Sequence, residues 1–158
     1  MNFESKFILD KPHYSECFEQ SNTIQPNPIK RHLKAIVLLC FGLFFYMVQI
    51  EGLSGHLGAF FFILAFVEVL SVIYAKVWWV TRQMWSKASG SEVAMTLNEQ
   101  GIEIKSDFSE YLLKWQDIQS FKETDKGVIL FPISGGNSYI SKTTISADGW
   151  RFLKTKLG

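Results

Sequence analysis

The chain has 158 residues, 47% of them hydrophobic, and 14 of them are phenylalanines. Its 16 basic and 15 acidic side chains give a formal net charge of +1, so it lacks the broad positive field with which proteins attract DNA or RNA. We therefore expect no nucleic-acid partner.

Residues 1–28 are expected to form a strand and a short helix on the cytoplasmic side. Alternating apolar residues predict the strand over Phe3 to Leu9. Asp10 can accept hydrogen bonds from the free N–H groups of a following first turn, which predicts a helix over residues 11–22. Pro26 and Pro28 prevent the helix from continuing, because proline lacks the backbone donor.

His13 and Cys17 are the reactive side chains of this N-terminal part. No second histidine or cysteine accompanies them at the spacing of a metal site. We therefore expect a surface histidine and a packed cysteine. Cys40 lies in the apolar segment that follows, in a different environment, so no disulfide is expected. Residues 1–29 contain no apolar run that would make them a signal peptide.

Two apolar runs dominate the chain, at Ala35 to Ile50 and Leu57 to Ala75. Each has about the length that a helix needs to cross some 30 Å of hydrocarbon. The connection, Glu51 to His56, is too short for a folded segment, so the two helices must be antiparallel. The sequence predicts a transmembrane hairpin within residues 29–86, with helices over about 33–53 and 57–80.

The cations flank this hairpin and are absent from its connection. By the positive-inside rule they place both termini in the cytoplasm. Trp78, Trp79 and Trp85 follow the second run and are typical of the membrane interface. The juxtamembrane basic residues are Lys30, Arg31, Lys34, Lys76, Arg82 and Lys87.

Glu68 is the one carboxylate inside an apolar run, and intramembrane carboxylates are candidates for function. Folding the hairpin about residue 53 or 54 places Glu68 opposite Cys40 to Gly42, where the first helix has no cation. We expect Glu68 to be protonated and hydrogen-bonded, or to pair across a homo-oligomer.

From Ser89 onward the apolar pattern changes to alternation, which is typical of β-strands. Ser146 can cap a closing helix whose apolar residues include Trp150, Leu153 and Leu157. Residues 89–158 are therefore expected to form a small bent sheet or barrel plugged by this helix, and the N-terminal strand could supply one edge. The predicted strands cover residues 93–97, 102–104, 111–115, 118–123, 128–131 and 138–141.

The hairpin, together with residues 96–102 (TLNEQGI), residues 113–118 (LKWQDI) and the pair Tyr139-Ile140, resembles the YcxB-like proteins of bacteria. The resemblance implies a bacterial inner-membrane, multi-pass protein with a cytoplasmic, pleckstrin-homology-like (PH-like) domain. The implied fold class is a membrane α-helical hairpin plus a small α+β or all-β bent sheet with a C-terminal helix. It implies no established activity.

Little in the sequence could support catalysis. Residues 89–158 contain no histidine and no cysteine, so a nucleophile with a base is not expected there, and we predict neither an enzyme nor a cofactor. Trp115 could be an anchor for a partner, but a tryptophan between Leu113 and Ile118 is more typical of a core. We expect a membrane-tethered binding or regulatory module that docks a protein or peptide, or forms a homo-oligomer. The alternatives are an oligomeric channel or transporter subunit using Glu68 and a module that binds anionic lipid headgroups.

Overall fold

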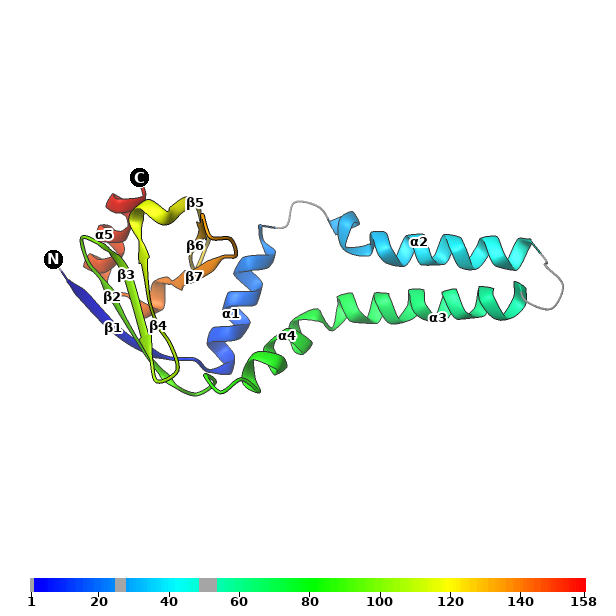
Figure 1. The fold of residues 1–158 in the computed structure, drawn as a ribbon, viewed down its shortest axis with the longest axis horizontal. Helices are drawn as coiled ribbons and strands as arrows, with labels where there is room; N and C mark the ends of the chain where they lie inside the picture. The colour runs from blue at the N-terminus through cyan, green and yellow to red at the C-terminus, as the bar shows by residue number, and fades with distance from the viewer. Residues whose placement is uncertain (1, 25–27, 49–53) are drawn as a thin grey trace. The chain divides into compact units, whose positions relative to one another are not determined.

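A computed structural model of the chain describes residues 2–24, 28–48 and 54–158. It contains five α-helices and seven strands in these ranges, and two antiparallel sheets, so the fold class is α+β (Figure 1). The chain divides into two compact units. Unit 1 comprises Met1–Ile24 and Trp79–Gly158, and unit 2 comprises Gln25–Trp78.

The N-terminal prediction is confirmed. Strand β1 covers Phe3–Ile8 and helix α1 covers Lys11–Asn22. Helix α1 begins after Asp10 because the backbone N–H of His13 donates to Asp10 Oδ1 at 2.9 Å, which satisfies a donor that the helix itself leaves free.

The first sheet of unit 1 has the strand order β1-β2-β3-β4. Strand β1 precedes the helical hairpin in sequence, and the other strands of this sheet follow it. Strand β1 nevertheless pairs antiparallel with β2, from Phe3↔Leu97 to Ile8↔Glu92. The expected role of the N-terminal strand as a sheet edge is thus confirmed. The other strands of this sheet are β2 (Glu92–Leu97), β3 (Gly101–Ser106) and β4 (Glu110–Lys114).

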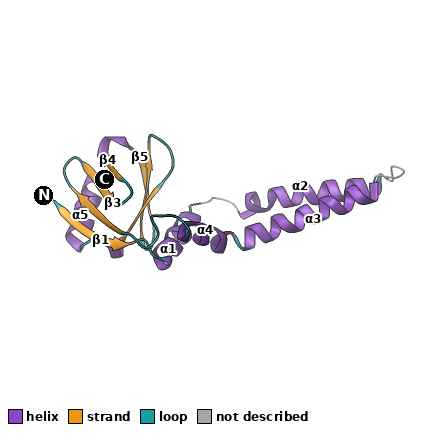
Figure 2. Cartoon of the chain, turned by 60° about the horizontal axis from the view of Figure 1, so that its bottom comes forward, coloured by secondary structure: helices purple, strands orange, loops and turns teal. Residues whose placement is uncertain are grey.

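The second sheet has the order β5-β6-β7 and is followed by the C-terminal helix α5. Figure 2 distinguishes the strands of unit 1 from this helix by colour. Apolar side chains of both sheets and Leu153 of α5 form one buried core, so the helix is part of the core rather than an appendage. The bounds are β5 (Ile118–Glu123), β6 (Gly127–Pro132), β7 (Ser138–Ser141) and α5 (Ala147–Leu157).

Gly149, which the sequence marks as a weak point of α5, has a packing reason. A Cβ atom built at this position would lie 2.7 Å from Ile145 Cγ2 and 3.4 Å from Phe3 Cβ. A Cβ atom here would also lie 3.2 Å from the capping Ser146 Oγ, whereas its distance to Phe3 corresponds to ordinary van der Waals contact. Glycine at this position therefore relieves crowding by Ile145 and Ser146 in the first turn of α5.

Unit 2 contains α2 (Pro28–Met47), α3 (Ser54–Ile73) and the start of α4 (Ala75–Met84). The helix predicted to begin at residue 33 begins five residues earlier, and the one predicted over 57–80 begins at Ser54 and is interrupted at Tyr74. Residues 51–53, half of the predicted connection, lie outside the described residues.

Helices α2 and α3 pack through small residues. A Cβ atom on Gly58 would lie 3.2 Å from the backbone oxygen of Gly42, and one on Gly42 would lie 3.4 Å from the oxygen of Gly58. One heptad further from the connection, Ala35 and Ala65 are both buried. This repeat of small residues lets the two backbones approach closely and fixes the register, with Gly42 opposite Gly58 and Ala35 opposite Ala65.

Of the described helices, only α3 is long and apolar enough over Gly55–Ile73 to cross a membrane by length and composition. The sequence predicted two such helices. The difference lies in α2, because the cations expected before the first helix are inside it. Lys30, Arg31 and Lys34 all follow Pro28, where α2 begins.

A leucine at Gly58 should separate the two helices, whereas a leucine at Gly55 should not, because a Cβ atom at Gly55 meets no atom within 4 Å. The measurement is disulfide formation between cysteines placed at Ala35 and Ala65 in a chain whose Cys17 and Cys40 are replaced by serine. We expect Gly58→Leu to reduce cross-linking by roughly tenfold and Gly55→Leu to leave it unchanged. Equal effects of the two variants would contradict the packing described.

Candidate functional site

Strand β5 lies at the edge of the second sheet, because among the described strands it pairs with β6 alone. Beside it, a groove of about 160 Å³ separates β5 from α5. Phe121 of β5 is 44% exposed at this groove although its side chain is large and apolar. We call this feature the β5–α5 groove, and its lining residues are Phe121, Glu123, Val128, Trp150, Leu153, Lys154 and Leu157.

Helix α5 is held beside β5 by its cap and by its amphipathic face. Ser146 Oγ accepts a hydrogen bond from the N–H of Gly149 at 3.1 Å, as the sequence predicts. Leu153 is fully buried, and Trp150 and Leu157 pack partly against the same core. The helical spacing that anchors α5 thus also places Trp150 and Leu157 along the groove.

The rim of the groove is charged. Lys154 Nζ lies 2.8 Å from Glu123 Oε1, and Lys142 Nζ lies 3.8 Å from the same oxygen. Both ammonium groups also lie over the ring of Trp150, at 5.4 Å for Lys142 and 6.0 Å for Lys154. Two cations therefore share one carboxylate, which leaves a net positive charge at the rim.

The same contacts change the acidity of Glu123. The hydrogen bond from Lys154 lowers the pKa of the Glu123 carboxyl, partial desolvation opposes this, and the charges of Lys154 and Lys142 lower it further. Glu123 is therefore a carboxylate at neutral pH, with no proton to transfer.

A polar network joins α1 to β7, and the sequence reasoning missed it. Glu16 Oε1 accepts hydrogen bonds from Tyr139 Oη at 2.7 Å and from Ser141 Oγ. Burial, together with the hydrogen bond to Glu16, raises the pKa of Tyr139. One turn later, buried Gln20 accepts from the N–H of Lys126. The spacing of Glu16 and Gln20, four residues apart on one helix face, is the signal that could have found it.

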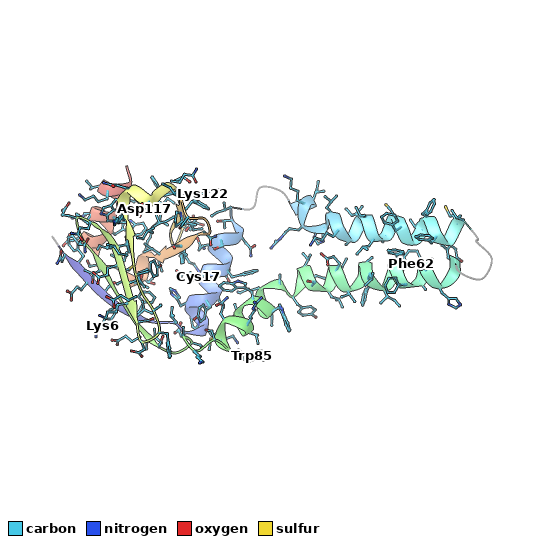
Figure 3. The ribbon with its side chains drawn as sticks, viewed as in Figure 1. Lys6, Cys17, Phe62, Trp85, Asp117 and Lys122 are labelled. Atoms are coloured by element: carbon cyan, nitrogen blue, oxygen red, sulfur yellow. The ribbon has the colours of Figure 1, made fainter. Side chains whose placement is uncertain are left out.

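His13 and Cys17 do not form a reactive pair. The His13 ring lies tilted against Phe7 and edge-on to Tyr14, with ring centroids at 5.0 and 6.2 Å, and burial lowers its pKa. It is therefore half-buried rather than the surface residue predicted. Burial raises the pKa of the Cys17 thiol to about 12, which makes it a poor nucleophile. Figure 3 labels Cys17 on α1, and both Cys17 and Cys40 are free.

Glu68 lies on the face of α3 that packs against α2. The register that joins Gly42 to Gly58 places Glu68 at the level of His32, so the predicted position opposite Cys40 to Gly42 is wrong. His32 follows Arg31 directly. Glu68 is also only five residues from the end of α3, or about 8 Å at the helical rise. The prediction failed because α3 begins earlier than the apolar run suggested.

Trp115 belongs to the periphery of the core, as expected. Its indole Nε1 donates to the backbone oxygen of Asn98 at 3.0 Å, and its ring meets Phe152 edge-on at 6.3 Å. The six cations predicted to flank the membrane lie on α2, on α4 and just after α4. Lys30, Arg31 and Lys34 belong to the first turns of α2, Lys76 and Arg82 belong to α4, and Lys87 follows α4.

The three tryptophans expected at the membrane interface differ from one another. Trp78 is 70% exposed and Trp85 is 80% exposed. Trp79 instead packs against α1, with ring centroids 6.2 Å from Tyr14 and 5.7 Å from Phe18. Trp79 is therefore a packing residue of unit 1, and only the other two present free aromatic surface. Trp78 and Trp79 are adjacent residues of α4, so their sequence positions alone did not reveal this difference.

Comparisons with known proteins address the C-terminal part of the chain. Residues 97–157 match the family model described as YcxB-like protein, which confirms the resemblance seen in the sequence. No curated protein matches the chain. A solved structure of the Dictyostelium discoideum myosin VII MyTH4-FERM MF2 domain aligns with 81% of this chain and 34% of its own, at 10% identity and a TM-score of 0.29. The chain thus spans about a third of that protein's length.

Replacing Lys154 by methionine should raise the pKa of the Glu123 carboxyl towards its ordinary value, because the main hydrogen bond to the carboxylate is lost. Since the folded-state pKa is depressed, the stabilisation from this pair is present above the unfolded pKa and is lost as pH falls through the folded pKa. NMR titration of the side-chain carboxyl carbons measures the change. Lys105→Met, on β3, is the control and should leave Glu123 unaffected; an unshifted Glu123 in Lys154→Met would refute the assignment.

Proposed function

We propose that this chain, whose residues 97–157 match the YcxB-like protein family, is a membrane-tethered binding module. In this proposal unit 2 anchors the chain in the bacterial inner membrane, and unit 1 binds an extended segment of a protein partner in the cytoplasm. The observation that carries the proposal is an apolar groove directly beside an unpaired strand edge.

The arrangement of unit 1 supports the PH-like fold that the family resemblance implies. Four antiparallel strands, then three, then a C-terminal helix that completes the core form the order expected of such a bent, two-sheet domain. In this chain the hairpin is inserted between the first and second strands. The domain is therefore assembled from residues on both sides of the proposed anchor.

Strand addition is the binding mode that the β5–α5 groove favours. An extended peptide can pair with the free backbone groups of an edge strand and place alternate side chains in neighbouring pockets. Along β5, Phe121 and the facing residues Trp150 and Leu157 of α5 supply the apolar pocket. Its volume of about 160 Å³ is suited to one large apolar side chain.

The charged rim of the groove favours one type of residue next to the apolar side chain of the bound peptide. Lys142 and Lys154 share the single carboxylate of Glu123. An acidic residue beside the apolar residue of the peptide would complete the charge balance. We therefore propose that the partner presents an extended segment with one large apolar residue and one nearby carboxylate.

The membrane anchor is supported by topology. Because β1 pairs with β2, the residues before and after unit 2 fold into one unit and must lie on one side of any membrane. A single crossing by α3 would separate them. If α3 spans the bilayer, α2 must return the chain, so the topology favours a two-helix hairpin with both termini on the same side. The cations that flank the hairpin favour the cytoplasm as that side.

The surface of the helix pair supports the proposed membrane anchor. Beyond the basic first turns of α2, most exposed residues of α2 and α3 are apolar, which would be costly in water. On α3 the large side chains that are more than half exposed are Phe60, Ile63, Phe66, Val67 and Ile73. The register also places Glu68 near the end of α3, where a carboxylate is less costly than at the bilayer centre.

Phe121→Ser should abolish selective peptide binding, because it removes the exposed apolar wall of the groove. The probe is a phage-displayed library of random peptides, selected on the detergent-solubilised full chain. We expect the selected peptides to share an apolar residue beside an acidic one. We expect Phe121→Ser to weaken their affinity for the chain by roughly tenfold or more. Phe108→Ser, which changes another exposed phenylalanine, in the β3–β4 turn, is the control. Selected peptides that bind both variants alike would refute the groove.

Fusions to alkaline phosphatase test the anchor separately. The enzyme should be active when fused after Gly55 and inactive when fused after Gly158, because only the connection should lie outside the cytoplasm. The full chain should remain with the membrane fraction in a carbonate wash. A chain that is monodisperse without detergent, or an active fusion at Gly158, would overturn the proposed topology.

A further inference from the structure

Strand β4 forms the outer edge of the first sheet, opposite β1. It has five residues, Glu110–Lys114, of which only Leu113 is buried. Tyr111 is 44% exposed and Leu112 is 40% exposed. A strand edge with exposed apolar residues is a template for pairing with another strand.

The backbone groups of β4 that point outward can be identified. The N–H of Ser106 donates to the oxygen of Ser109, and the N–H of Trp115 donates to the oxygen of Gln100, both between β3 and β4. Bonded positions alternate along an antiparallel pair, so the odd-numbered residues of β4 bond inward to β3. Glu110, Leu112 and Lys114 therefore direct their N–H and C=O groups to the free edge.

Space for another strand exists along this edge. A groove of about 550 Å³ runs between β4 and the β6–β7 turn. Tyr111 and Leu112 border it on one side, and Pro132, Ile133 and Ser138 border it on the other. Ile133 is 67% exposed, so the far side of the groove is also apolar.

We infer that β4 pairs antiparallel with β4 of a second copy of this chain. The sequence of the strand, Glu-Tyr-Leu-Leu-Lys, is self-complementary about Leu112. In that two-fold register Glu110 of each copy faces Lys114 of the other copy. Leu112 of one copy faces Leu112 of the other. The outward-bonding residues meet one another, which gives about six hydrogen bonds across the edge.

The charges at the two ends of β4 favour a copy over an unrelated strand. Within the described residues Lys114 makes no ion pair, and Glu110 makes only an exposed one, with Lys105 at 3.3 Å. Opposite charges directly across an antiparallel pair stabilise it and like charges oppose it. A partner with the same charge order thus satisfies both ends at once. The inference concerns β4 alone, and it rests on neither the β5–α5 groove nor membrane insertion.

A charge exchange tests the register. The self-association constant of the detergent-solubilised full chain is measured by analytical ultracentrifugation. Glu110→Lys and Lys114→Glu should each weaken dimerisation by roughly tenfold or more, because each places like charges opposite one another. The double variant should recover the wild-type affinity, although it still lacks the Lys105 contact. Arg151→Glu on α5 is the control and should have no effect.

A cysteine at Leu112 supplies a second measurement. In a chain with Cys17 and Cys40 replaced by serine, Leu112→Cys should be cross-linked to itself by a short bis-maleimide, whereas Lys122→Cys on β5 should not. A monomeric chain at all concentrations, a double variant as weak as the single ones, or equal cross-linking at both positions would overturn the inference.

Discussion

The antiparallel pairing of β1 with β2 is the contact on which the organisation of this chain depends. It joins Phe3–Ile8 to Glu92–Leu97 across the whole helical pair. Phe3 and Phe7 pack against the core, and Phe152 of α5 meets the same strand, with its ring centroid 5.3 Å from that of Phe3. Because unit 1 includes residues on both sides of unit 2, the hairpin is an insertion in a folded domain rather than a leader attached to it.

The segments that flank the insertion are themselves packed into unit 1. Helix α1 is held to β7 by the hydrogen bonds that Tyr139 and Ser141 donate to Glu16. The part of α4 in unit 1 contributes Trp79, which meets Tyr14 and the neighbouring ring of Phe18. A charge-assisted network on one side and an aromatic cluster on the other therefore connect both ends of the insertion to the same core.

Local signals predicted unit 1 well and unit 2 less well. Asp10 and Ser146 bond the first turns of their helices, and period-two alternation marks the strands, so these elements follow from near neighbours in sequence. The start of α2 does not follow from such local signals. Hydropathy alone cannot distinguish a basic first turn of a helix from a basic loop before it. The position of Glu68 depended on the Gly42–Gly58 contact, and the β5–α5 groove depends on β5 being an edge. Both are properties of pairing between distant segments.

Among the described edge strands of unit 1, β4 and β5 differ from each other in a way that suits different partners. On β4 the charges stand at opposite ends, so an antiparallel copy matches them. On β5 both charges, Lys122 and Glu123, stand at one end. An antiparallel copy of β5 centred on the strand would place them opposite Gln119 and Ile118 and leave them unpaired. Edge strands invite non-specific association, and the order of charges on β4 supports the pairing with a second copy that we infer. The helix beside β5, with its groove and shared carboxylate, supports the proposal that this edge binds a foreign segment.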